Sequence, residues 1–134
     1  MLHSRQITLT AGGSSANPTK TSFLANQGVI ARAWITFPPG CAGLVKVRIL
    51  HGGHPFIPVD PNQYLRGDSY TYEIPAMYEI TDVPELIIVE AWNEDDTYNH
   101  TIDVQLLIIE KAWGQPVGAY EGIIAALKSI FTRR

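Results

Sequence analysis

The stretch GLVKVRIL, residues Gly43–Leu50, decides the fold class because apolar and basic side chains alternate along it. In an extended chain its two valines and Ile49 lie on one face, and Lys46 and Arg48 lie on the other. This period of two residues is typical of a β-strand with one buried and one solvated face. The stretch therefore predicts a sheet that packs one face on a core.

The same kind of pattern recurs on both sides of this stretch. Segments of alternating or β-branched apolar residues are Arg5–Thr10, Lys20–Ala25, Gly28–Phe37, Asp68–Ile74, Glu85–Trp92 and His100–Glu110. Runs rich in Gly, Ser, Asn and Pro separate them, and we expect the two longest, Ala11–Thr19 and His51–Asn62, to be irregular. About seven or eight strands at this spacing predict a mainly β protein, an antiparallel β-sandwich or jelly roll.

The C-terminal segment departs from this pattern. After the Gly/Pro hinge Trp113–Pro116, apolar residues recur at the spacing of one face of an amphipathic α-helix. This C-terminal apolar stripe consists of Tyr120, Ile123, Ile124, Leu127, Ile130 and Phe131. We therefore expect a sandwich domain over residues 1–113, followed by a hinge and helix over residues 114–134.

Three positions are open to this helix. It can cover its own sandwich, dock into a groove of a neighbouring subunit, or lie on a membrane surface. The membrane alternative ranks last, because the polar side of the helix is formed by small residues rather than by lysines. A helix behind a hinge suits an arm between subunits, so the stripe is our candidate for partner contact.

The length and the cysteine content are those of a single domain without disulfides. The chain has 134 residues and one cysteine, Cys41. Its N-terminus lacks the pattern of a secretory signal, and no apolar run reaches the roughly 20 residues of a membrane span. We expect a protein made in the cytoplasm.

Charges are divided along the chain. The segment before Asp60 has a net charge of +5, Asp60–Glu110 has −11 with Arg66 as its one basic residue, and the remainder has +3. This division either gives faces of opposite potential, which favours ordered association, or is mixed by interleaved strands. The acidic balance and the lack of a basic patch with interleaved aromatic residues argue against nucleic acid as a partner.

Signals for chemistry are sparse. His51, His54 and His100 are the candidates for a cupin-like metal site, but two of them lie in a Gly/Pro loop without a suitably spaced Glu. The run Glu94-Asp95-Asp96 is either a calcium-binding loop or a solvated hairpin tip, and the spacing favours the tip. We expect Cys41 to be a buried or turn cysteine. The sequence predicts neither an enzyme nor a cofactor.

The stretch YLRGDSYTYEIP contains Arg66-Gly67-Asp68-Ser69, the motif that adhesion proteins present to integrins. Gly67-Asp68 is also a favourable turn pair, and an alternating strand pattern follows it directly. A three-residue match carries little weight alone. We expect a turn that leads into a strand, and no integrin binding.

Two stretches carry a resemblance to a known class of protein. ITLTAGGSSANPTKTSFLANQGVIARAWITFPPGCAGLVKVRILHGG and EAWNEDDTYNHTIDVQLLI, about half of the chain, resemble small β-sandwich accessory proteins of tailed-phage-like particles in style and strand order. Such proteins decorate a capsid or join head and tail parts. The resemblance implies a non-enzymatic virion protein without cofactor, assembled in the host cytoplasm. Its implied partners are copies of itself and particle proteins such as a major capsid protein, with Pro38–Asn62 as contact loops.

The expected mechanism is lattice binding through loops, the N-terminal strand and the C-terminal helix. Deletion of Val117–Arg134 should then leave a folded sandwich that does not assemble. The alternative is a ligand-binding sandwich of the carbohydrate-binding type. Its stacking platforms would come from Trp34, Trp92, Trp113, Tyr64, Tyr70, Tyr72, Tyr78 and Tyr98. Exposed coplanar rings would favour that alternative, and rings buried between sheets would contradict it.

Overall fold

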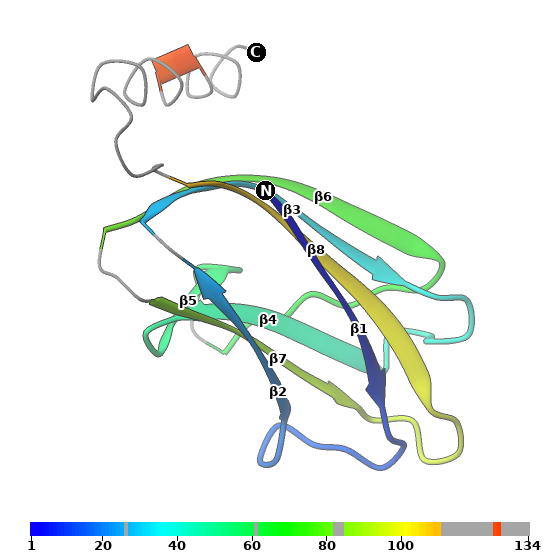
Figure 1. The fold of residues 1–134 in the computed structure, drawn as a ribbon. Helices are drawn as coiled ribbons and strands as arrows, with labels where there is room; N and C mark the ends of the chain where they lie inside the picture. Colours follow the sequence, from blue (N-terminus) through cyan, green and yellow to red (C-terminus); the bar gives the residue numbers. More distant parts are fainter. Residues whose placement is uncertain (26, 61, 82–84, 111–124, 127–134) are drawn as a thin grey trace.

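The computed structural model describes residues 1–25, 27–60, 62–81, 85–110 and 125–126. The described part folds into eight strands in two layers (Figure 1). The strands are β1 (Leu2–Leu9), β2 (Thr19–Ala25), β3 (Gly28–Phe37), β4 (Val45–His51), β5 (His54–Ile57), β6 (Tyr70–Ile80), β7 (Glu85–Asn93) and β8 (His100–Glu110). The predicted mainly β class is confirmed. The predicted hinge and helix lie outside the described residues.

The strands pair in a nested order. One sheet has the order β1-β8-β3-β6, the other has β2-β7-β4-β5, and all pairs are antiparallel. The first strand thus pairs with the eighth, the second with the seventh, the third with the sixth and the fourth with the fifth. An antiparallel ribbon folded over on itself gives this order, and its two layers form an antiparallel β-sandwich.

The core fills the space between the two sheets. In β4 the predicted alternation is confirmed, because Val45, Val47 and Ile49 are fully buried while Lys46 and Arg48 remain half-exposed. Other large, fully buried side chains come from both sheets and include Leu9, Phe23, Ile35, Phe37, Ile87, Ile102 and Leu106. Each such side chain stabilises the fold by about 1.5–3 kcal/mol relative to an exposed one.

Several strand boundaries differ from the prediction, most of all those of β5 and β6. The segment His51–Asn62 was expected to be irregular, but His54–Ile57 forms β5. Strand β6 also continues past the predicted Ile74 to Ile80. Both β5 and β6 are edge strands in their sheets. Pro55 and Pro75 lack a backbone N–H, and they are tolerated at an edge because a strand there has no second neighbour whose hydrogen bonds would be lost.

The two ends of the sandwich differ in composition. At one end, the loop end, lie the connections β1–β2, β3–β4, β5–β6 and β7–β8 (Figure 1). At the other end, the terminal end, β1 begins, β8 finishes and the strands β2, β4 and β6 finish as well. The chain therefore enters the described sandwich and leaves β8 at the same end.

Close backbone packing marks the terminal end. Gly28, the first residue of β3, pairs with Ile80 on one side and Glu110 on the other. A Cβ atom at Gly28 would collide with the carbonyl oxygen of Ile109 and lie 2.8 Å from the Glu110 Cα. Only glycine allows β8 to approach β3 this closely.

The nested pairing mixes the two charged halves of the chain. Ion pairs join early basic residues to late acidic ones, and Glu90 of β7 lies between Lys20 of β2 at 3.9 Å and Arg48 of β4 at 2.7 Å. Arg32 of β3 likewise pairs with Glu73 of β6. Of the two interpretations of the charge division, the structure favours mixing by interleaved strands.

Candidate functional site

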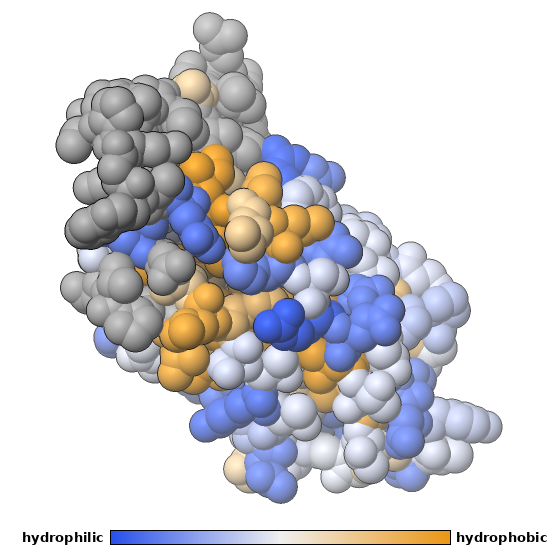
Figure 2. Space-filling view, in the orientation of Figure 1, coloured by the Kyte–Doolittle hydropathy of each residue, from blue (hydrophilic) through white to orange (hydrophobic). Residues whose placement is uncertain are grey.

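Four exposed aliphatic side chains lie at the terminal end, while Leu44, Val59, Tyr70 and Tyr98 are exposed at the loop end. Met1 and Leu2 are 73% and 53% exposed, and Leu24 and Leu86 are 62% and 49% exposed. Leu24 and Leu86 are cross-strand partners on the outer face of β2 and β7. Figure 2 shows apolar surface concentrated toward this end, while the loop end is mostly polar on the same face. We call these four residues the apolar terminal surface.

The apolar terminal surface flanks an open edge of the sandwich. Among the described strands, β1 pairs with β8 alone and β2 pairs with β7 alone, so within this part of the chain each has one unpaired backbone edge. Two polar side chains of β1 close the gap between the layers: the Arg5 guanidinium lies 4.9 Å from the Phe23 ring centroid, and the His3 ring meets that of Phe23 edge-on at 6.3 Å. Charged side chains that point inward on an edge strand hinder pairing with another chain. Contact with a partner is therefore favoured at the leucines rather than along the whole edge.

At the loop end, a buried asparagine joins three segments. Asn93 is fully buried, and its Nδ2 donates to the carbonyl oxygens of Leu9 at 3.2 Å and Tyr98 at 2.8 Å. Its Oδ1 accepts from the Asp95 N–H at 3.0 Å. The backbone of Gly13 donates to the Asn93 carbonyl oxygen at 2.7 Å. These bonds fix the β1–β2 connection to the β7–β8 connection.

A carboxylate–imidazole pair lies in the same connection. Asp95 Oδ2 is 2.9 Å from His100 Nε2, and both residues are 9% exposed. The N–H of Thr97, the His100 side chain and the N–H of Tyr98 bond to this carboxylate, and they hold the pKa of Asp95 below its ordinary value of 3.8. The pair rigidifies the turn from β7 into β8.

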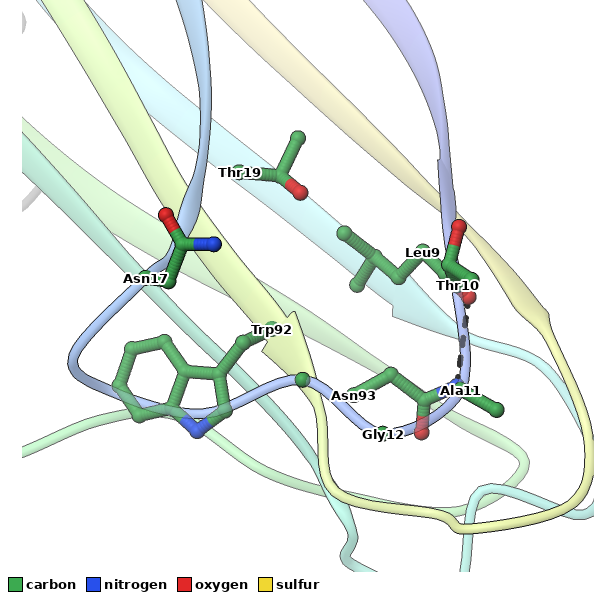
Figure 3. Close-up of a pocket in the computed structure, with 9 residues that line it drawn as sticks. Leu9, Thr10, Ala11, Gly12, Asn17, Thr19, Trp92 and Asn93 are labelled. Carbon is green, nitrogen blue, oxygen red and sulfur yellow. Dashed lines mark hydrogen bonds between the residues drawn. The ribbon is translucent and has the colours of Figure 1, made fainter.

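The cavity drawn in Figure 3 belongs to this bonded region. It measures about 190 Å³ and is enclosed by the β1–β2 connection and the end of β7, where Trp92 and Asn93 point to opposite sides. The indole Nε1 of Trp92 donates to Glu94 at 2.9 Å. Its volume is below that of typical small-molecule sites, which measure about 300–1,000 Å³.

A larger groove opens beside the β5–β6 connection. It measures about 460 Å³ and is lined by Lys46, Asn62, Gln63, Tyr64, Arg66 and Tyr72. Tyr64 packs edge-on against Trp92, with ring centroids 4.7 Å apart. We call this space the loop groove. Its volume lies within the range of small-ligand sites, and most of its lining is polar.

The Arg66-Gly67-Asp68-Ser69 motif forms one wall of the loop end. The Asp68 carboxylate accepts the Gly40 N–H at 2.9 Å, and the Ser69 N–H bonds the Pro38 carbonyl oxygen at 3.4 Å. Ser69 has a left-handed φ of 50°, and β6 begins at the next residue. The predicted turn into a strand is confirmed, and its aspartate is engaged in holding the β3–β4 connection.

The three histidines that could have formed a metal site lie apart in the fold. The Nδ1 atom of His51 lies 2.5 Å from the Tyr78 hydroxyl, whereas His100 is paired with Asp95 at the other end. His54 lies exposed at the start of β5. Among the described residues, no three His, Cys, Asp or Glu side chains are grouped as metal ligands.

The three carboxylates of the β7–β8 connection point to different partners. Glu94 accepts from Trp92 and lies 3.8 Å from the Lys46 ammonium, while Asp95 bonds His100. Asp96 accepts from the Thr97 hydroxyl at 2.8 Å. The arrangement is that of a hairpin tip in which Glu94 and Asp96 are exposed, as predicted for a solvated tip, whereas Asp95 is buried.

Cys41 is fully buried in the core. Burial, and then the charges of Asp68 and Asp95, raise the pKa of its thiol above the ordinary value of 9.0. The protonated thiol is a poor nucleophile. The predicted buried cysteine is confirmed.

The aromatic residues are arranged mainly for packing. Trp92 is 3% exposed, and the exposed Tyr70 meets Tyr72 with the ring planes 82° apart. Phe56 and Tyr78 are the stacked pair, at 4.4 Å and 20°, and both are half-buried. The coplanar exposed platform that a flat sugar-binding face requires is not present among the described side chains. Tyr64 and Tyr72, however, line the loop groove.

The residues predicted for partner contact, Tyr120, Ile123, Ile124, Leu127, Ile130 and Phe131, lie outside the described residues. Sequence reasoning missed the apolar terminal surface, because Leu24 and Leu86 lie in strands whose other apolar residues are buried, apart from the half-buried Ile88. Their exposure could have been predicted only from the alternation of side chains along the strands, because Leu24 and Leu86 point to the face opposite that of Phe23 and Ile87.

Comparisons with known proteins give no relative. No protein-family model, curated protein or solved structure matches the chain. In the described residues there is no helix with the length and apolar character needed to cross a membrane.

Proposed function

We propose that this protein is a non-enzymatic structural component of a virus-like particle, which binds neighbouring copies of itself and a capsid-type partner as a decoration or connector subunit. The observation that carries the proposal is the apolar terminal surface. Met1, Leu2, Leu24 and Leu86 expose apolar area on both sides of one open edge, and such surface on a small sandwich typically marks a contact with another protein.

The strand order supports the same role. An eight-stranded sandwich with the nested order β1-β8-β3-β6 facing β2-β7-β4-β5 is consistent with a jelly roll, the finer form of the predicted fold. Jelly rolls are frequent among capsid and lectin domains. Fold alone does not establish function, so the surface must carry the argument.

The contact would form in a defined way. Leu24 and Leu86 lie side by side on the outer face of β2 and β7, so they can enter an apolar depression of a partner as one unit. Edge residues Arg5 and His3 oppose pairing of β1 with a partner strand. Strand β8 ends here at Glu110, and the C-terminal apolar stripe, which follows later in the sequence, is proposed as the second contact element.

The first experiment measures the mass of the full chain by light scattering at several concentrations and two salt levels. We expect concentration-dependent association that the double substitution Leu24→Lys with Leu86→Glu abolishes. Val59→Asp is the matched control, because Val59 is 72% exposed and apolar but lies in the β5–β6 connection. If the wild-type protein is strictly monomeric, self-association is excluded and only the contact with the capsid partner remains. If wild type, the double variant and Val59→Asp associate equally, the apolar terminal surface is not the contact surface.

The second experiment tests the particle itself. Particles from the organism that encodes this chain are separated on a density gradient and probed with an antibody against the protein. The proposal requires the protein to migrate with the particle fraction at a fixed ratio to the major capsid protein. Its absence from every particle fraction would overturn the virion assignment.

A further inference from the structure

The loop groove is a space with fixed walls. Leu65 and Val47 exchange two backbone hydrogen bonds, of 2.8 and 3.0 Å, so the segment around Leu65 continues the sheet beside β4 where the short β5 does not reach. On the opposite wall, the Tyr72 hydroxyl donates to the Arg66 carbonyl oxygen at 2.7 Å. A groove fixed in this way loses little conformational entropy when a ligand binds.

One ring of the groove is held in place by its neighbours. Tyr64 packs edge-on against the buried Trp92, and the Arg48 guanidinium lies 6.0 Å from the Tyr64 ring centroid. Tyr64 is half-buried, so part of it still faces the groove. A single fixed aromatic ring is suited to contact with the C–H groups of one sugar ring.

The amide side chains supply hydrogen bonds of both kinds. Asn62 and Gln63 are exposed and adjacent along the same wall. A carboxamide offers two donors and an acceptor, which matches the mixed donor and acceptor character of sugar hydroxyl groups. The polar lining disfavours a lipid or another apolar ligand.

The charge of the groove is provided by Arg66. Lys46 is engaged, because its ammonium bonds the Gly43 carbonyl oxygen at 2.5 Å and lies 3.8 Å from Glu94. Arg66 is exposed, and it is the one basic residue between Asp60 and Glu110. Its guanidinium forms no hydrogen bond or ion pair with any other described residue. A guanidinium so placed can bind a carboxylate through two parallel hydrogen bonds.

We propose that the loop groove binds a saccharide that carries a carboxylate, such as a uronic acid unit. Tyr64 contacts the apolar face of the sugar, Asn62 and Gln63 bond its hydroxyl groups, and Arg66 pairs with its carboxylate. The proposal does not depend on particle assembly, because the groove lies at the loop end and the apolar terminal surface lies at the other end.

The test is calorimetric titration of the full chain with tetragalacturonate. The matched neutral probe is the fully methyl-esterified tetramer, which keeps the sugar rings and removes the charge, and inorganic phosphate tests a simple anion. We expect saturable binding of tetragalacturonate alone. Arg66→Gln should weaken it about tenfold or more, because a charge-assisted hydrogen bond contributes about 1.5–3 kcal/mol.

Lys20→Gln is the matched control, because Lys20 is an exposed cation on the far strand β2 and should leave the affinity unchanged. Tyr64→Phe should keep most of the affinity, since it preserves the ring. Circular dichroism confirms that each variant is folded. Equal binding of the esterified probe, equal binding of phosphate, an unaffected Arg66→Gln variant, or no heat with any saccharide at millimolar concentration would each overturn the proposal.

Discussion

The two ends of the sandwich are built on different principles. At the loop end, hydrogen bonds join all four connections: Gly12 bonds the Asp95 carbonyl oxygen at 2.7 Å, Glu94 bonds that of Leu44 at 2.9 Å, and Gly40 bonds the Asp68 carboxylate at 2.9 Å. The terminal end instead relies on close backbone packing around Gly28 and leaves leucines exposed.

This difference separates two roles within one small domain. The connections at the loop end satisfy one another's hydrogen-bonding groups and therefore form a rigid rim. A rigid rim can hold the loop groove in a preformed shape. An end that exposes apolar side chains gains stability only when another surface covers them. The substitutions below test this division, from the largest expected effect to the smallest.

Asn93→Ala should have the largest effect on stability. It removes the three side-chain hydrogen bonds to Leu9, Tyr98 and Asp95 and leaves buried backbone groups unsatisfied. We expect a loss of about 3 kcal/mol in the free energy of unfolding, measured with urea. The control Asn99→Ala, which removes only an exposed bond to the Ala11 N–H, should cost about 1 kcal/mol or less. Similar losses for both would mean that the rim does not depend on its buried asparagine.

Gly28→Ala should weaken the terminal end by about 2 kcal/mol, because the added Cβ meets the backbone of β8 and forces the strands apart. Gly67→Ala is the control, since its nearest contact would be the Phe37 ring at 3.3 Å, a much milder approach than the collision at Gly28. Hydrogen exchange should show faster exchange at β3 and β8 near Gly28. Unchanged protection there would contradict the packing argument.

Acidification should weaken the loop end through Asp95. The folded state holds the pKa of Asp95 below 3.8. The ionised carboxylate therefore contributes fully to the free energy of unfolding above pH 3.8, and this contribution is lost as the pH falls through the lower pKa of the folded state. The stability difference between wild type and Asp95→Asn should therefore shrink as urea titrations go from pH 7 to pH 3. For the control Asp96→Asn, at an exposed position, we expect no such trend. A constant difference for Asp95→Asn would show that charge is not what stabilises the turn.

The smallest effect on stability is expected at the apolar terminal surface. The Leu24→Lys and Leu86→Glu double variant should unfold within about 0.5 kcal/mol of wild type at low protein concentration, because both side chains are largely exposed in the monomer and the new charges are opposite in sign across the strands. The same variant should lose self-association. A large loss of monomer stability would show instead that these leucines are covered within their own chain.

Much of the fold was predictable, because alternation in segments such as Gly43–Leu50 reports which face is buried. The short β5 was not, since its proline and flanking glycines signal a loop, and only its place at a sheet edge makes the strand acceptable. Early basic strands and late acidic strands are the partners in the nested pairing, so the division of charge along the sequence follows the topology.

The candidate site was less predictable. Tyr64 and Tyr72 were recognised as possible ligand contacts, but nothing in the sequence places them in one groove with Arg66. That arrangement requires the Val47–Leu65 bridge, which joins residues of a proline-rich connection to a strand by backbone bonds alone. Backbone bonds leave no residue-specific trace in a single sequence.

The nested pairing also has a consequence for synthesis on the ribosome. The hairpin of β4 and β5 can form as soon as it emerges, but Leu2 must wait for Leu107 before β1 has its neighbour. Until then the nascent chain presents an unpaired strand that carries Leu2, Ile7 and Leu9. Pairing between such distant residues is slow to close, so a trigger-factor-type chaperone that shields the first strand should raise the yield of native protein.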